Sequence, residues 1–236
     1  SGRVKNFKFI DYMLCLFPFE LDFCSNVRKK AFYIGHPLIE NEDNYLDENT
    51  EEIICLMPGS RNSEIKQNLP VMIEGFRKFN EENDYTALIP AYDSSAKELV
   101  ETFIKDEPKI SCEQVESSKI LKRSSAAVIC SGTATLEGLL AEVPTTIIYK
   151  TNWLNYLIYR SLMKSVFAGI PNILAEKEIF TELIQNQATK DAIAEDLKNN
   201  LNNIDTKKKI MNEVKRKIVK TDFSAFSNEI YEDCRS

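Results

Sequence analysis

Two short stretches of the sequence place glycine and small polar residues where an apolar run gives way to a helical pattern. PGSRNSEI follows the run EIICLM, and CSGTATLEGLL follows the run AAVI. A turn between a strand and a helix leaves backbone N–H groups free at the positive end of the helix dipole, so it can bind an anion such as phosphate. In the first stretch, Gly59 would allow a ligand to approach closely, and Ser60 and Arg61 would add donors.

The second stretch has the same character and adds a carboxylate. Glu137 lies about one turn inside the helix that follows, where it could accept hydrogen bonds from the vicinal hydroxyls of a ribose. The turn itself would then donate to the phosphates of the same ligand. The small and hydroxyl-bearing residues of this turn are Ser131, Gly132, Thr133 and Thr135.

Both stretches also have a purely structural interpretation. Ser60 or Ser63 could cap the first helix, with Glu64 completing a capping box. Glu137 could act only on the dipole of the second helix. Neither stretch is a GxGxxG or a Walker A loop, so the pattern alone supports no more than a nucleotide-like ligand.

The elements around these turns indicate an α/β fold. Short apolar runs alternate with helical patterns, and the runs are mostly continuous, which is typical of strands buried on both faces of a parallel sheet. Helical spacing is clear over 63–83, where Pro70 should kink or restart the helix, and over 94–106. The expected strands are DYMLCLF, KAFYIGH, EIICLMP, YTALIPA, AAVIC and PTTIIY.

The chain changes character along its length, which suggests its domain organisation. The acidic segment 39–52 lacks periodicity and is typical of a linker, and helix follows helix after Thr151. We expect 1–40 to be the end of an N-terminal domain, 41–205 a Rossmann-like ligand-binding domain, and 206–236 C-terminal helices that could pack back towards the N-terminal domain. The expected late helices are 153–167, 178–186, 189–203, 205–220 and 222–234.

Composition excludes several classes of function. The chain of 236 residues has a formal net charge of −6 and a pI near 5.1, which argues against a nucleic-acid binder. Its six cysteines are widely spaced, no CxxC pair occurs and there is one histidine, so we expect reduced thiols and no metal site. Polar and charged residues interrupt the apolar stretch 153–170, which therefore should not span a membrane.

Several segments together resemble the lipid-A-disaccharide synthase family. They are PGSRNSEIKQNLPVMIEGF, SGTATLEGLLAEVPTTIIYK and IPNILAEKEIFTELIQ, with LFPFE and GHPL in the same order before them. The resemblance spans residues 16–185 and implies a family-19 glycosyltransferase of GT-B architecture, in which two Rossmann-like domains face each other across a cleft. The C-terminal domain of such enzymes holds the nucleotide sugar.

The resemblance also implies roles for individual residues. The PGSR and SGTAT turns would contact the diphosphate of UDP, Glu137 would bind its ribose, and Arg61 and Asn172 would contribute to catalysis. The general base would lie in an N-terminal domain that precedes residue 1. The implied nucleotide-binding set is Gly59, Ser60, Arg61, Ser131, Gly132, Thr133, Thr135, Glu137, Asn172 and Glu178.

One departure from the family pattern lies close to these residues. The family has Gly-Arg where this chain has Glu176-Lys177, so a bidentate guanidinium is lost and a carboxylate is gained near the expected diphosphate.

The reaction implied by the resemblance moves 2,3-diacylglucosamine from UDP to 2,3-diacylglucosamine 1-phosphate, with inversion and without a metal or other cofactor. The partners would be these two substrates, an N-terminal half supplied in cis or in trans, the cytoplasmic face of the inner membrane, and a second copy of the chain. We expect a cytoplasmic, peripheral enzyme. Two alternatives are a UDP-sugar-binding or assembly module without catalysis of its own, and a sugar-nucleotide epimerase of the same architecture.

Two further features allow a functional and a structural interpretation. His36 could be a general base, but a turn histidine fixed by Gly35 and Pro37 is the favoured interpretation. The aromatic and basic residues of 153–164 could touch a membrane surface, whereas the helical spacing of its leucines favours ordinary packing.

Overall fold

The computed structural model describes residues 9–39, 51–150 and 167–235. Contacts between residues divide the chain into two units. Residues 42–215 form the larger unit, and residues 1–41 together with 216–236 form the smaller one. The expected helix at 153–167 lies almost entirely outside the described residues.

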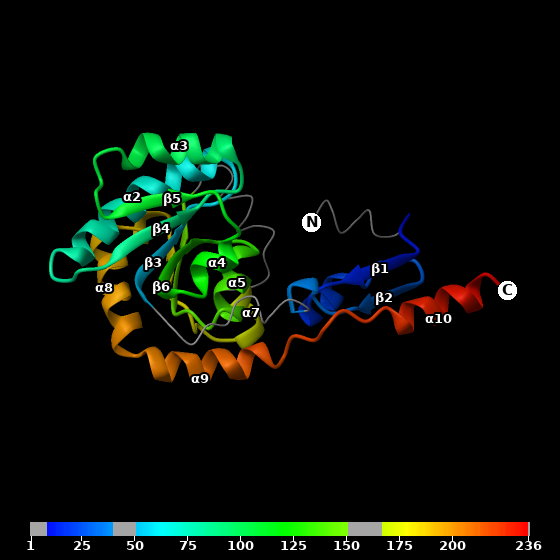
Figure 1. Ribbon diagram of the computed structural model, residues 1–236. Helices are drawn as coiled ribbons and strands as arrows, with labels where there is room; N and C mark the ends of the chain where they lie inside the picture. The colour runs from blue at the N-terminus through cyan, green and yellow to red at the C-terminus, as the bar shows by residue number, and fades with distance from the viewer. Residues whose placement is uncertain (1–8, 40–50, 151–166, 236) are drawn as a thin grey trace. The chain divides into compact units, whose positions relative to one another are not determined.

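The larger unit is built on a parallel sheet (Figure 1). In the described part of the chain its strand order is β5-β4-β3-β6-β7-β8, and every neighbouring pair is parallel. The central strands β3 and β6 are buried over most of their length, as expected for continuous apolar runs. The strands are β3 Glu51–Met57, β4 Thr86–Pro90, β5 Ile110–Glu113, β6 Ser124–Cys130, β7 Thr145–Tyr149 and β8 Glu182–Ile184.

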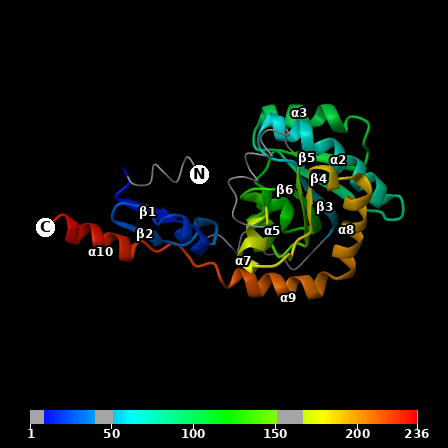
Figure 2. The same ribbon diagram turned by 180° about the vertical axis from the view of Figure 1, so that it is seen from behind.

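Helices cover both faces of this sheet (Figures 1 and 2). The helix α2 packs against α3 and α8, whereas α5 packs against α4, α7 and α9. The core on the α2 side includes the fully buried side chains of Leu69, Met72 and Phe76. The helices are α2 Asn62–Asn80, α3 Ser94–Ile104, α4 Ser117–Leu121, α5 Ala134–Leu140, α7 Ile170–Ala175, α8 Lys190–Asn202 and α9 Ile204–Lys215.

The predicted α/β fold with a parallel sheet is confirmed, and the structure differs from the sequence predictions at three places. The segment 178–186 is not a helix, because it contains β8 and leads into the 3-10 turn Gln185–Gln187. Pro70 does not restart the helix, since α2 continues through it, and a kink at this position stays a prediction. The strand β5 was not predicted, because ISCE is short and less apolar than its neighbours.

The smaller unit joins the two ends of the described chain. It contains the parallel strands β1 Tyr12–Cys15 and β2 Lys30–Tyr33, the 3-10 helix Pro18–Phe23 and the helix α10 Ser224–Asp233. Phe226 of α10 packs edge-on against Tyr12 and Phe32, with ring centroids 5.9 and 5.7 Å apart.

None of the helices in the described residues is both long enough and apolar enough to cross a membrane.

Candidate functional site

The strand order places the two turns next to each other. From β3 the chain proceeds to β4 and β5 on one side of the sheet, whereas from β6 it proceeds to β7 and β8 on the other. The direction of winding therefore reverses between β3 and β6, which is where open α/β sheets bind ligands beyond the carboxyl ends of the strands. Met57 pairs with Ile129 in register, so the turns begin side by side.

The turn after β3 has its backbone donors occupied by a side chain of its own helix. The N–H groups of Ser60 and Arg61 lie 3.1 and 3.3 Å from Oε2 of Glu64, and they donate to it. The Arg61 guanidinium donates to Oε1 of the same carboxylate at 2.6 Å. Arg61 is the N-cap residue of α2, so neither Ser60 nor Ser63 takes the predicted capping position. Glu64 thus acts as an internal anion at this turn.

Gly59 is the residue that lets Glu64 reach the turn. Its φ is +113°, in the region that side chains disfavour. A Cβ atom at Gly59 would lie 2.5 Å from Oε2 and 2.6 Å from Cβ of Glu64. The glycine is therefore required by the backbone conformation and by the close approach of the glutamate.

The turn after β6 is open where the first is closed. Gly132 has a φ of +151°, and a Cβ atom placed there would meet no atom of the described residues within 4 Å. Gly132 and Thr133 are exposed, and no described side chain accepts a hydrogen bond from their N–H groups. Ser131 donates through its hydroxyl to the carbonyl of Ala168 at 3.0 Å, which ties the turn to the segment before α7.

Thr135 is turned away from this opening. Its side chain is fully buried, and its hydroxyl donates to the carbonyl of Gly132 at 2.7 Å. In this conformation Thr135 shapes the turn, and its predicted contact with a phosphate stays a prediction.

Glu137 lies on the same short helix and is only partly buried. The hydroxyl of Ser117, at the start of α4, donates to its carboxylate. Because β5 and α4 were not predicted, the sequence pattern gave no sign that Ser117 would meet Glu137. The contact fixes the carboxylate at the carboxyl edge of the sheet without enclosing it.

Asn172 was predicted to bind the nucleotide together with the two turns, but its side chain is not accessible as Gly132 and Thr133 are. It is fully buried, and its amide nitrogen donates to the carbonyl of Phe180 and to Glu182 at 2.7 and 2.8 Å. Its oxygen accepts the N–H groups of Ile179 and Phe180, both at 2.9 Å. With its donors and acceptor satisfied inside the protein, Asn172 holds the loop between α7 and β8. Its contact with a nucleotide stays a prediction.

Two glutamates organise the same loop. Glu182 accepts the N–H groups of Ala168 and Gly169 at 2.7 and 2.9 Å, just before α7 begins. Glu178 is exposed and accepts the N–H of Glu182 at 3.1 Å. Glu182 was not predicted to matter, because nothing in the sequence distinguishes it from the other glutamates nearby.

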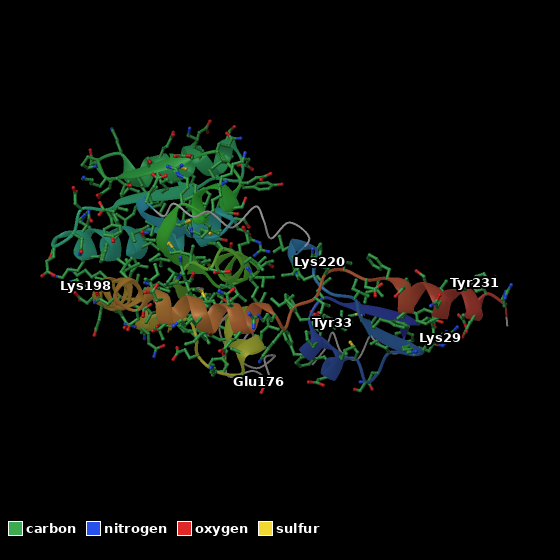
Figure 3. All side chains as sticks on the ribbon, turned by 60° about the horizontal axis from the view of Figure 1, so that its bottom comes forward. Lys29, Tyr33, Glu176, Lys198, Lys220 and Tyr231 are labelled. Carbon is green, nitrogen blue, oxygen red and sulfur yellow. The ribbon has the colours of Figure 1, made fainter. Side chains whose placement is uncertain are left out.

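Glu176, labelled in Figure 3, lies where the chain departs from the pattern that the resemblance implies. It is the C-cap of α7 and has a left-handed conformation, with φ +57° and ψ +18°. This conformation favours glycine, the residue that the resemblance implies at this position. Glu176 and Lys177 are both exposed.

Asn68 was also missed, although a signal was available. It lies on the buried face of α2, three residues after Ile65 and four before Met72, where an apolar side chain would be expected. Its side chain is fully buried and contacts groups from three strand ends. A polar residue on an apolar stripe could have marked it.

His36 and Cys130 are both enclosed. The His36 ring packs on Phe17 with centroids 4.9 Å apart, and Nδ1 accepts the N–H of Leu38 at 3.2 Å, which is the geometry of a turn histidine. Burial lowers the pKa of His36, and Glu20 opposes this shift. Burial raises the pKa of the Cys130 thiol to about 12, so this cysteine beside the second turn is not a nucleophile at neutral pH.

Among the described residues, no cluster of three or more His, Cys, Asp or Glu side chains could hold a metal ion.

Comparison with known proteins identifies relatives over most of the chain. The family model described as lipid-A-disaccharide synthetase matches residues 3–231. The lipid-A-disaccharide synthase of Alcanivorax borkumensis is 31% identical over 207 residues, covering 82% of this chain and 54% of the relative. That of Acinetobacter baylyi is 33% identical over 237 residues, covering 89% of this chain and 59% of the relative. The chain thus spans little more than half the length of these relatives.

Solved structures support the fold. A Staphylococcus aureus TarM structure in complex with UDP has a TM-score of 0.56 at 15% identity, covering 91% of this chain and 41% of that one. A Methanocaldococcus jannaschii UDP-GlcNAc 2-epimerase in complex with UDP-GlcNAc and UDP has a TM-score of 0.56 at 15% identity, covering 81% and 54%. The fold is GT-B-like. From the match to the family model over nearly its whole length, this chain belongs to the lipid-A-disaccharide synthetase family.

Proposed function

We propose that this chain is the donor-binding half of a lipid-A-disaccharide synthase. The reaction would transfer 2,3-diacylglucosamine from UDP to 2,3-diacylglucosamine 1-phosphate, with inversion and without a metal or other cofactor. The observation that carries the proposal is the adjacency of two glycine-containing turns at the switch point of the sheet, in a chain of this family.

The turn after β6 would supply the better phosphate site of the two. Its exposed Gly132 and Thr133 leave room for a diphosphate close to the backbone. Glu137 would accept the ribose hydroxyls from the same helix, in place of or beside the Ser117 hydroxyl that it accepts here. The ribose and the diphosphate of one UDP molecule would then be bound by one short segment of the chain.

Arg61 would act from the neighbouring turn. Its side chain is 78% exposed, and the ion pair with Glu64 restrains it. A guanidinium at this position would stabilise the negative charge that develops on the β-phosphate as UDP leaves. The chain would therefore contribute electrostatic stabilisation, and an N-terminal half, in cis or in trans, would supply the acceptor site and the general base.

The location of the reaction follows from its substrates. Two acylated sugars are confined to a membrane surface, so we propose a cytoplasmic enzyme that works at the inner face of the inner membrane, and it could do so as a homo-oligomer. A binding module without catalysis is not favoured, because the match to the enzyme family covers nearly the whole chain.

The test is a calorimetric titration of the chain with UDP. We expect saturable binding that Glu137→Ala and Arg61→Ala each weaken about tenfold, the usual scale for losing one charged hydrogen-bonding partner. Arg77→Ala is the matched control, because it removes an exposed arginine from the last turn of the same helix. Absence of binding by the folded chain, or equal weakening by the control, would contradict the proposal.

A further inference from the structure

One buried side chain connects the two turns. Nδ2 of Asn68 lies 3.1 Å from the carbonyl oxygen of Pro58, which begins the turn after β3. The same nitrogen lies 3.4 Å from Sγ of Cys130, the last residue of β6, and 3.0 Å from the carbonyl of Glu64. Asn68 therefore contacts the start of both turns and the first turn of α2.

The opposite side of the amide reaches a third strand. Oδ1 of Asn68 accepts the N–H of Lys150 at 3.1 Å, directly after the end of β7. The Lys150 N–H can only donate and the two carbonyls can only accept, so the orientation of the amide is fixed by its partners. One side chain from one helix thus holds the ends of β3, β6 and β7.

This arrangement exceeds what packing requires. Asn68 replaces an apolar residue on the stripe that α2 presents to the core, and its side chain is fully buried. A buried amide is stable only when its polar atoms are paired, and an apolar residue of the same shape often serves stability as well. In addition to packing, the hydrogen bonds of the amide fix the distances between the ends of β3, β6 and β7.

We propose that Asn68 is a positioning residue that sets the turn after β3 and the turn after β6 at the spacing needed to bind one diphosphate. The inference rests on the proposed function for the role of that diphosphate. Asn68 itself need not touch the ligand. It acts through the Pro58 carbonyl on one turn and through Cys130 on the other.

The matched control is Asn200, a second fully buried asparagine of the same unit. Its amide donates to Thr146 and Asp196, both at 3.2 Å. Thr146 lies near the start of β7, whereas Lys150 follows the end of that strand. Asn200 and Asn68 therefore anchor opposite ends of β7, and only Asn68 contacts the turns.

The experiment compares Asn68→Leu and Asn200→Leu in the chain, each leucine keeping the branched shape without the polar atoms. Two measurements are made: the affinity for UDP by calorimetry, and the backbone amide resonances of Gly59 and Gly132 without ligand. We expect Asn68→Leu to weaken UDP at least tenfold and to displace both glycine resonances. Asn200→Leu should lower thermal stability while leaving both measurements unchanged.

A milder variant keeps the test decisive if Asn68→Leu does not fold. The serine of Asn68→Ser can still donate to the Glu64 carbonyl one helical turn back, but it is too short to reach Lys150. A folded serine variant that binds UDP like the parent, with unmoved glycine resonances, would overturn the inference.

The two measurements separate the inference from the proposed function. If the parent chain does not bind UDP, the proposed function fails together with the ligand part of this inference. The resonances of Gly59 and Gly132 still report whether Asn68 holds the two turns. If the parent binds UDP and Asn68→Leu binds it equally well, only the positioning role is overturned.

Discussion

The turn after β3 and the turn after β6 resemble each other in sequence, yet their backbone donors are used differently. The first directs the N–H groups of Ser60 and Arg61 at the carboxylate of Glu64. The second exposes Gly132 and Thr133, with open space beside the glycine. A strand, a glycine and a serine thus form the same kind of turn in both places. In the first turn, the carboxylate of Glu64, the third residue of α2, accepts the N–H groups of Ser60 and Arg61.

The comparison shows that capping and ligand binding are not exclusive interpretations. The geometry that lets Glu64 cap α2 is the geometry that would let a phosphate bind, because both use the same free N–H groups. A ligand that reaches both turns must displace Glu64 from the first and meets no such competitor at the second. The two turns should therefore respond differently to substitution.

The largest difference is expected between the two glycines. Gly59→Ala should lower the free energy of unfolding by about 3 kcal/mol, because it combines backbone strain with a clash that expels the Glu64 cap. Gly132→Ala should cost only ~1.5 kcal/mol, because the added methyl group meets open space and strain alone remains. Urea denaturation of the two variants measures both values. Equal losses of stability in the two variants would show that the capping contact of Glu64 does not require glycine at position 59.

The second expected effect concerns binding. Glu64→Gln removes the internal anion and frees Arg61, so UDP should bind about tenfold more tightly, the equivalent of ~1.4 kcal/mol. Calorimetry with UDP measures the change. Glu74→Gln is the control, because it neutralises an exposed carboxylate on the same helix away from the turn.

Weaker binding by Glu64→Gln would reverse this interpretation. It would mean that Glu64 holds Arg61 in place for the ligand and does not compete with it. Glu64 would then preorganise the turn after β3 for the ligand. The two turns would differ in whether a glutamate holds them in the binding conformation, and not in whether a glutamate blocks the ligand.

The turn at the end of α7 offers the reverse substitution, because a residue other than glycine has the left-handed conformation there. Glu176 has a positive φ without being glycine, so Glu176→Gly should raise the free energy of unfolding by about 1 kcal/mol through relief of strain. Lys177→Gly, at the next and equally exposed position, lacks a positive φ and should be slightly destabilising. Thermal unfolding of both variants checks the prediction. A loss of stability in Glu176→Gly would show that the carboxylate makes a contact worth more than the strain.

Sequence patterns predicted the fold well because its signals are local. Continuous apolar runs indicated β3, β4, β6 and β7, and helical periodicity indicated α2, α3 and α8. The prediction failed where the signal was short. Residues 178–186 mix helix formers such as glutamate and leucine with isoleucine, phenylalanine and threonine, which favour strands. Pairing of Glu182–Ile184 with β7 decides for the strand, and this long-range contact is not visible in a local pattern.

The positions of the two turns of the candidate site were predictable from the sequence, but the contacts of their side chains were not. The order of strands and turns brought PGSR and SGTAT to one edge, as expected from parallel topology. The contacts of Ser117 with Glu137, and of Asn68 with Lys150, join residues distant in sequence, so no local pattern encodes them. The burial of Asn172 depends on the loop that folds around it, and the spacing of residues in the sequence does not reveal this.

The smallest expected effect is a pH dependence of stability that comes from His36, which lies in neither turn. Burial lowers the pKa of His36, so the unfolded chain, with a histidine pKa of about 6.5, binds a proton more readily than the folded chain. The contribution of neutral His36 to the free energy of unfolding should therefore be fully present above about pH 6.5. It should decrease as the pH drops below this value, by less than ~1 kcal/mol down to pH 5.5. In His36→Asn the amide oxygen can accept the Leu38 N–H in place of Nδ1, so this loss should disappear. Urea denaturation of parent and variant without ligand measures the difference, and an identical pH slope in the two would assign the effect to other groups, the turn carboxylates included.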